Sequence, residues 1–157
     1  MALRISAWIC RLALGSLFAY AGYFKIRNPF LFEMAVDAYH LLPAGGVIVV
    51  ARTLPWLEIA LGVLLIVGWR LTWVAGFTAL LLGGFVGAMS ITYARGIEAT
   101  CGCFGFGERI SPLTLARDTA MVGLAVFLTV WSWKRNARAR NQASAGSEGA
   151  AHVSTET

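Results

Sequence analysis

Charged side chains are scarce in this chain, where Asp, Glu, Lys and Arg together make up 13% of 157 residues. Hydrophobic residues reach 58%, which is more than a soluble domain of this size carries. The few basic residues form no stripe and are not interleaved with an aromatic platform, so the net charge of +5 does not indicate nucleic-acid binding. The composition instead predicts an all-α integral membrane protein whose partner is the lipid bilayer.

Polar segments long enough to form a second domain are also lacking. Four apolar runs each reach the length of about 20 residues that a helix needs to cross a bilayer. They cover roughly residues 5–26, 47–68, 71–94 and 112–133. We expect one four-transmembrane-helix bundle over residues 1–133, followed by a disordered cytoplasmic tail over 134–157 that has almost nothing apolar to bury.

The stretch between the first two runs, residues 27–46, is too polar to cross the membrane and yet contains several large apolar residues. It predicts an interfacial amphipathic helix. Asn28 is the expected N-cap and Pro29 the expected first helical residue, because proline is well tolerated at that position.

The basic residues predict the orientation of the spans through the positive-inside rule. Four spans place both termini on one side, and Arg4 with the basic run 134–140 makes that side the cytoplasm of a bacterial inner membrane. The connection between the third and fourth runs then faces the periplasm. A signal peptide cleaved after the A-x-A-like sequence 19–21 is the alternative for the N-terminus, but Ile5 and Trp8 extend the apolar run and favour an intact span.

Cysteine is rare, and the three cysteines occupy two different settings. Cys10 lies near the inner end of the first run, separated from the outer surface by roughly 20 Å of helix, whereas a disulfide requires Cα atoms within about 7 Å. We therefore interpret Cys10 as a small buried hydrophobe. Cys101 and Cys103 flank Gly102 in the loop between the third and fourth runs. A disulfide in so small a ring adds little to folding and is strained, which suits redox exchange better than a structural role.

Few other metal ligands accompany this pair. Two thiolates are too few for a zinc site or an iron-sulfur cluster, and without a cluster of Met or His beside them they make a poor copper site. We interpret Cys101 and Cys103 as the catalytic pair of a thiol-disulfide oxidoreductase. A structural disulfide and a thiolate metal site stay open as alternatives.

Ionisable residues inside the apolar runs are the second candidate feature, because each is costly in lipid unless it faces the bundle and finds a partner. We expect a buried polar cluster in the outer half of the bundle. Its members are Lys25, Arg52, Glu58, Arg117 and Asp118. The cluster either fixes the register of the helices or orients a membrane quinone and moves protons.

Two further patterns concern helix shape. Pro55 inside the second run predicts a kink that widens the outer half of the bundle and opens a cavity there. Small residues along the third run predict close helix packing. They are Gly83, Gly84, Gly87 and Ala88.

Several short motifs, taken together, are typical of one family of membrane proteins. They are Arg11, Gly22 with Lys25, Asn28-Pro29, Tyr39 with Leu41-Leu42-Pro43, Leu54-Pro55-Trp56-Leu57-Glu58 with Gly62, Cys101-Gly102-Cys103-Phe104-Gly105 and Leu115-Ala116-Arg117-Asp118. The chain resembles the MauE family of methylamine utilisation proteins, within the broader DoxX-like group of four-helix membrane proteins. The resemblance covers roughly residues 4–133, and the C-G-C-F-G loop is its most specific element.

The resemblance implies an inner-membrane protein that acts with a periplasmic thioredoxin-like (MauD-like) partner in disulfide formation, during maturation of the methylamine dehydrogenase small subunit. In such a mechanism the partner and the Cys101/Cys103 pair exchange a disulfide, and a membrane quinone is the candidate that reoxidises the pair. Two other classes stay open. One is a non-catalytic membrane scaffold for a thioredoxin-like protein, and the other is a thiolate copper carrier.

Overall fold

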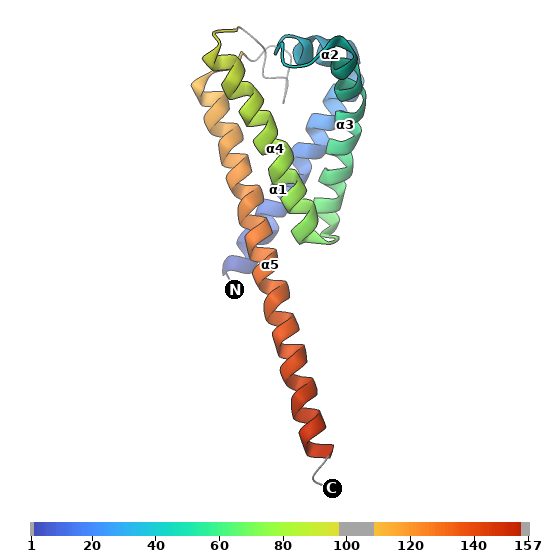
Figure 1. The fold of residues 1–157 in the computed structure, drawn as a ribbon, viewed down its shortest axis with the longest axis vertical. Helices are drawn as coiled ribbons and strands as arrows, with labels where there is room; N and C mark the ends of the chain where they lie inside the picture. The colour runs from blue at the N-terminus through green and yellow to red at the C-terminus, as the bar shows by residue number, and fades with distance from the viewer. Residues whose placement is uncertain (1, 98–108, 155–157) are drawn as a thin grey trace.

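The structure is a computed structural model, and it describes residues 2–97 and 109–154 of the chain. Its five helices follow one another as α1 (Ala2–Arg27), α2 (Pro29–Asp37), α3 (Ala44–Val67), α4 (Leu71–Ala94) and α5 (Pro112–Ser154). Figure 1 shows α2 at one end of a bundle formed by the four long helices, and both chain termini toward the other end.

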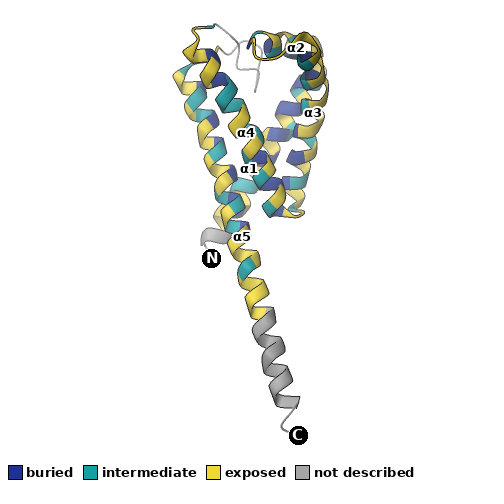
Figure 2. Ribbon diagram, viewed as in Figure 1, coloured by how far each residue is buried: buried dark blue, intermediate teal, exposed yellow. Residues whose placement is uncertain are grey.

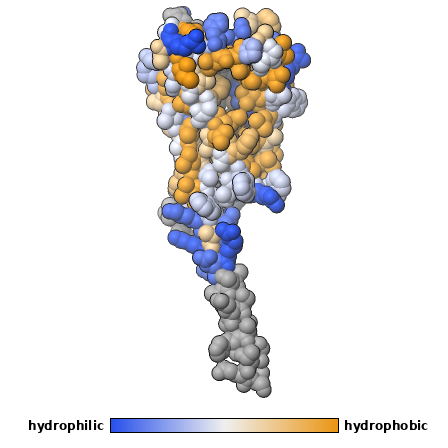
Figure 3. Space-filling model, in the orientation of Figure 1, coloured by the Kyte–Doolittle hydropathy of each residue, from blue (hydrophilic) through white to orange (hydrophobic). Residues whose placement is uncertain are grey.

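Four of these helices are long and apolar enough to cross a membrane, which confirms the predicted architecture. The spans are Ile5–Arg27, Ala44–Val67, Leu71–Ala94 and Pro112–Gln142. Hydrophobic side chains cover the middle of the bundle, and hydrophilic ones gather where α5 leaves it (Figure 3). Buried and exposed positions alternate along each span, as expected for helices with one face on the bundle and the other outward (Figure 2). The chain is therefore a multi-pass membrane protein with a short helix between spans one and two.

The long helices associate as two pairs. Helix α1 packs mainly on α3, and α4 packs mainly on α5, with far fewer contacts between the pairs. One core cluster joins the two pairs. It contains fully buried residues from each long helix, namely Leu14 of α1, Leu65 of α3, Ala75 of α4 and Leu128 of α5. Figure 1 shows the two pairs diverging toward the end where α2 lies. The core therefore holds the pairs together mainly in the half away from α2.

Glycines bring α1 and α3 into backbone contact. A Cβ atom on Gly62 would lie 2.7 Å from both the Ala19 nitrogen and the Gly15 carbonyl oxygen, and one on Gly22 would lie 2.6 Å from the Pro55 carbonyl oxygen. No side chain larger than hydrogen fits at these distances without a backbone shift. The close approach brings the side chains of Lys25 and Glu58, which lie near the Gly22–Pro55 contact on α1 and α3, within hydrogen-bond distance of each other.

The small residues of α4 behave differently from the expectation. Among the residues that the structure describes, a Cβ atom on Gly83, Gly84 or Gly87 would meet no heavy atom within 4 Å, so these glycines do not form a close contact between the described helices. The prediction of tight packing along the third span is therefore wrong at these positions. Their physical effect is to leave open space, and Gly84 and Ala88 line a cavity between the helix pairs.

Helix ends follow the local sequence. Helix α2 begins at Pro29, as predicted, but the Asn28 side chain does not cap it and instead donates to the Phe24 carbonyl oxygen at 3.3 Å. Helix α3 ends at Gly68, whose φ of 78° lies in the left-handed region that glycine adopts without a Cβ penalty. The Gly68 N–H donates to the Leu64 carbonyl oxygen at 2.8 Å and closes the last turn.

Helix α5 extends beyond the bundle. The sequence predicts a disordered tail from residue 134, whereas the structure continues the helix to Ser154. The tail is rich in Ala and contains several Arg residues, both of which are good helix formers, and extending a formed helix is far easier than starting one. This part leaves the bundle (Figure 1), in agreement with a composition that has almost nothing apolar to bury.

Candidate functional site

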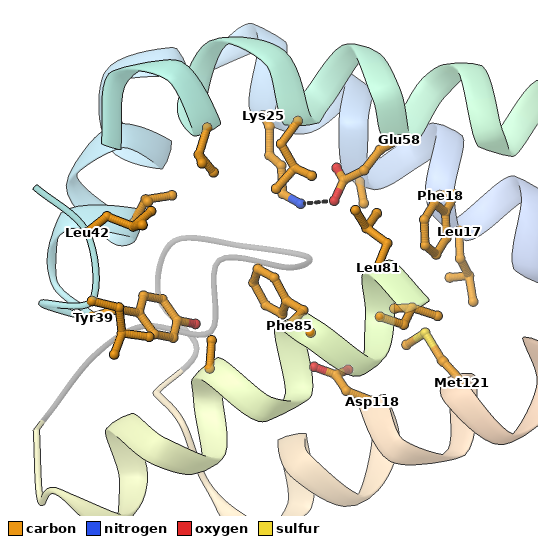
Figure 4. A pocket seen from close by; sticks show the side chains of 18 residues that line it. Leu17, Phe18, Lys25, Tyr39, Leu42, Glu58, Leu81, Phe85, Asp118 and Met121 are labelled. Atoms are coloured by element: carbon orange, nitrogen blue, oxygen red, sulfur yellow. Dashed lines mark hydrogen bonds and ion pairs between the residues drawn. The ribbon is translucent and has the colours of Figure 1, made fainter. Parts of the chain in front are cut away.

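A cavity of about 240 Å³ lies between the two helix pairs, in the half of the bundle nearer α2. All five helices and the turn after α2 contribute residues to its wall, which is mostly apolar (Figure 4). The lining residues are Leu17, Phe18, Ala21, Lys25, Val36, Tyr39, Leu41, Leu42, Val50, Leu54, Glu58, Leu81, Leu82, Gly84, Phe85, Ala88, Asp118 and Met121. Three of them, Lys25, Glu58 and Asp118, carry ionisable groups in this otherwise apolar wall.

Lys25 and Glu58 form a buried ion pair on one wall of the cavity. The Lys25 ammonium donates to Glu58 Oε1 at 2.5 Å, and the Lys25 residue is only 1% exposed. The same ammonium lies 4.9 Å from the ring centroid of Phe32 in α2 and 5.8 Å from that of Phe85 in α4. Aromatic faces attract cations, so these two rings help to hold the charge inside the bundle.

The two carboxylate oxygens of Glu58 differ in their hydrogen bonding. Oε1 accepts the Lys25 hydrogen bond, while Oε2 is buried and has no hydrogen-bond partner among the residues that the structure describes. A buried polar atom without a partner costs free energy, and such atoms occur where a ligand, a proton or a water is handled. Glu58 is therefore the side chain in this wall best suited to interact with a bound molecule.

Asp118 enters the cavity from α5, on the wall opposite the ion pair (Figure 4). It is 2% exposed, and its Oδ1 accepts a hydrogen bond from Arg117 Nε at 3.1 Å. Arg117 does not line the cavity and its side chain is partly exposed. Arg52 is exposed on α3 and also lies outside the cavity wall.

Of the five residues predicted to form a polar cluster, the structure thus brings three into one cavity. Lys25, Glu58 and Asp118 line this cavity. Arg117 lies outside the cavity wall and donates to Asp118, and Arg52 is exposed outside it. The cavity occupies the part of the bundle where Pro55 predicts one.

Three aromatic residues of the wall, Phe18, Tyr39 and Phe85, were not identified as site residues from the sequence. Tyr39 is 7% exposed, and its ring meets that of Phe85 edge to face, with 6.2 Å between centroids. Tyr39 belongs to the motifs that support the family resemblance, which is the signal that points to it. Phe85 lies within an apolar run and carries no comparable signal in the sequence.

Comparison with known proteins gives the family. The family model described as "Methylamine utilisation protein MauE" matches residues 3–131. The chain belongs to the MauE family. It is 34% identical over 122 residues to the methylamine utilization protein MauE of Paracoccus denitrificans and 33% identical over 122 residues to that of Paracoccus versutus. Each match covers 76% of this chain and 66% of the relative, so the chain spans just under two thirds of the relatives' length. No solved structure matches it.

The cysteines of this MauE-family chain lie in two places. Cys10, on α1, is a free thiol that packs against the core, although it is only partly buried and not fully buried as expected. Cys101 and Cys103, the predicted catalytic pair, lie outside the described residues. They belong to the connection between α4 and α5, and Figure 1 shows these two helices ending and beginning at the end of the bundle that carries α2.

Proposed function

We propose that this MauE-family protein is a membrane thiol-disulfide redox protein that supports methylamine utilisation. The observation that carries the proposal is the Cys101-Gly102-Cys103 sequence in the α4–α5 connection of a chain that belongs to this family. The named relatives are methylamine utilization proteins, and a paired dithiol in a short connection is suited to exchange rather than to structural support.

The reaction is a thiol-disulfide exchange with a thioredoxin-like partner. A thiolate of the reduced partner attacks one sulfur of the Cys101/Cys103 disulfide, which breaks the S–S bond and forms a mixed disulfide. The second thiol of the partner then attacks the mixed disulfide. The partner leaves as a disulfide, and the Cys101/Cys103 pair keeps two electrons and two protons as a dithiol.

The setting follows from the charge distribution. The basic residues after Trp133 favour a cytoplasmic side for the termini, and the cysteine connection then faces the periplasm of a bacterial inner membrane. Disulfides form and persist in that compartment. The oxidised partner supports disulfide formation in a secreted enzyme, for which the methylamine dehydrogenase small subunit is the candidate.

Single-cysteine variants test this proposal. With Cys103→Ser or Cys101→Ser, we expect a mixed disulfide with the partner that survives acid quenching and disappears on reduction. Cys10→Ser is the matched control, because Cys10 lies toward the opposite end of the bundle and is expected to leave exchange unchanged.

Three results would contradict the proposal. The first is that neither single variant traps a partner. The second is that the variant with both Cys101→Ser and Cys103→Ser retains full activity in methylamine-dependent growth, as a scaffold would. The third is that the reduced protein binds one copper ion per chain and loses it on oxidation, as a metal carrier would.

A further inference from the structure

The cavity between the helix pairs has the size of a single substituted ring. Its volume is about 240 Å³, and apolar protein cavities of about 150 Å³ already accept a benzene ring. The cavity is partly open, and it lies where the α1–α3 and α4–α5 pairs have few contacts with each other. A ring held there can therefore keep an apolar tail between the pairs and in the lipid.

The charges around the cavity favour a neutral occupant. Lys25 is paired with Glu58, and Asp118 is paired with Arg117, so the four groups sum to no net charge. A cation would require an excess of carboxylates, and an anion would require an excess of basic groups. An acyl chain would fit the apolar wall, but it has no polar atoms that could bind the buried ionisable side chains. Membrane proteins keep such side chains where a substrate or a proton is handled.

The polar atoms suit a ring that bears carbonyl oxygens. The Lys25 ammonium has three N–H donors, one of which is directed to Glu58, and a carbonyl oxygen can accept another. Glu58 Oε2 is buried without a partner in the described part of the chain, and this charged oxygen can take up a proton during the reaction and then donate it to the same ligand. The Phe85 ring beside the ammonium offers a face for ring stacking. Asp118 supplies a second polar group on the opposite wall (Figure 4).

We propose that this cavity binds the ring of a membrane quinone, with Lys25 and Glu58 at one carbonyl oxygen, and that the quinone reoxidises the cysteine pair. The inference rests on the proposed redox function. In the step, the two S–H bonds of the reduced Cys101/Cys103 pair break and an S–S bond forms. The quinone takes up the two electrons and two protons and becomes a quinol. Glu58, a carboxylate in the resting cavity, takes up one of the two protons released by the thiols and passes it to the carbonyl oxygen that it contacts.

Two neighbouring glycines provide a matched test by filling the cavity. Gly84 lines the cavity and Gly83 does not, while a Cβ at either position meets no heavy atom of residues 2–97 or 109–154 within 4 Å. Full-length protein in lipid nanodiscs is assayed in two steps, with a benzoquinone carrying a decyl tail as the probe. The first step is single-turnover disulfide transfer from the oxidised protein to reduced thioredoxin, and the second is quinone-dependent reoxidation of the reduced protein.

We expect Gly84→Leu to keep the first step and to slow the second at least tenfold, and Gly83→Leu to keep both. Wild-type protein that performs the first step without quinone-dependent reoxidation overturns the quinone inference alone. Equal reoxidation by Gly84→Leu and Gly83→Leu also overturns it. Failure of the first step in wild-type protein overturns the proposed redox function instead.

A binding readout keeps the inference testable without turnover. An azido-substituted benzoquinone, activated by light, is expected to label peptides of α1, α3, α4 or α5 that line the cavity, and excess decyl-benzoquinone is expected to abolish that labelling. Glu58→Gln is expected to retain labelling and to slow reoxidation at least tenfold, because the amide cannot deliver a proton. Labelling confined to other parts of the chain, or competed equally by a saturated fatty acid, would overturn quinone binding in the cavity.

Discussion

Lys25 and Glu58 illustrate how a buried charge is tolerated in this bundle. Each would cost several kcal/mol in a low-dielectric interior if it were alone. The hydrogen bond between them, and the two aromatic rings near the ammonium, offset that cost. Because the pair is almost completely buried, removing one partner leaves the other charge without compensation.

Lys25→Met is therefore expected to lower the free energy of unfolding by about 3–5 kcal/mol, because Glu58 is left buried without its counter-ion. Unfolding of the purified protein in mixed micelles with increasing SDS measures this change. Lys134→Met is the control, since Lys134 is exposed on α5 beyond the bundle and its removal leaves no buried charge. Equal stability of the two variants would show that the ion pair does not stabilise the fold.

The double variant Lys25→Met with Glu58→Leu separates pairing from burial. Replacing a whole buried ion pair by apolar residues is often close to neutral, so we expect the double variant to be more stable than Lys25→Met alone. The difference is measured in the same SDS titration. A double variant as unstable as the sum of the two single variants would contradict a direct coupling between the two side chains.

At the scale of the helices, the contact between α1 and α3 decides where the charged residues meet. Gly15, Gly22 and Gly62 allow the two backbones to touch, and a Cβ at Gly62 would be 2.7 Å from backbone atoms that cannot rotate away. The α4 glycines have the opposite role, because they leave space at the cavity. Glycine thus permits close packing of α1 on α3, and in α4 it leaves space for the cavity between the two helix pairs.

Gly62→Ala is expected to lower the free energy of unfolding by about 1–3 kcal/mol, because the new methyl group forces α1 and α3 apart. Gly83→Ala is the matched control. It adds the same methyl group to an exposed helical position with open space, where alanine is expected to be neutral or to stabilise by up to about 1 kcal/mol. SDS unfolding compares the two, and a Gly62→Ala protein as stable as Gly83→Ala would contradict the close α1–α3 contact.

The extension of α5 is expected to be dispensable for the bundle. Ser132 is buried, but the residues at 133–136 are exposed, and Asn136 donates a hydrogen bond of 3.3 Å to Thr72 Oγ1 of α4. A chain that stops after Gln142 should change the free energy of unfolding by less than about 0.5 kcal/mol, as for surface changes generally. A loss of several kcal/mol in SDS unfolding would show that the extension packs against the bundle.

At the scale of the whole molecule, the orientation in the membrane can be read from two exposed positions at opposite ends. Asp37 lies at the end of α2, and Arg138 lies on α5 beyond the bundle. In a background without native cysteines, we expect Asp37→Cys to react with a membrane-impermeant maleimide added from the periplasmic side. Arg138→Cys should react only after the inner membrane is opened.

The control is complete labelling of both variants after detergent solubilisation, which shows that each thiol is reactive. The reverse pattern would place the termini in the periplasm and the cysteine connection in the cytoplasm. Disulfide exchange with a periplasmic partner would then be ruled out.

Much of the fold could be predicted from the sequence because membrane insertion depends on length and hydropathy, which are local properties. The four spans and the short α2 helix appear where the apolar runs and Pro29 predict them. The tail after residue 134 differs, because composition describes what a segment can bury and not whether an existing helix continues through it. The burial of Lys25, Glu58 and Asp118 was also predictable, since an ionisable residue inside a span is costly in lipid, whereas the same expectation does not hold for Arg52, which is exposed on α3.

The sequence by itself determined that the chain spans a membrane four times, that its cysteine pair lies in one connection, and that buried charges need partners. The tertiary structure alone decided which charges meet. Lys25 and Glu58 are 33 residues apart, and they pair because glycine contacts set the distance between α1 and α3. Arg52, equally polar, is exposed on α3 in the described part of the chain and takes no part in the cavity wall. Side-chain identity is a local property, whereas the pairing of helices depends on contacts distributed along their whole length, and so the cavity emerges only in three dimensions.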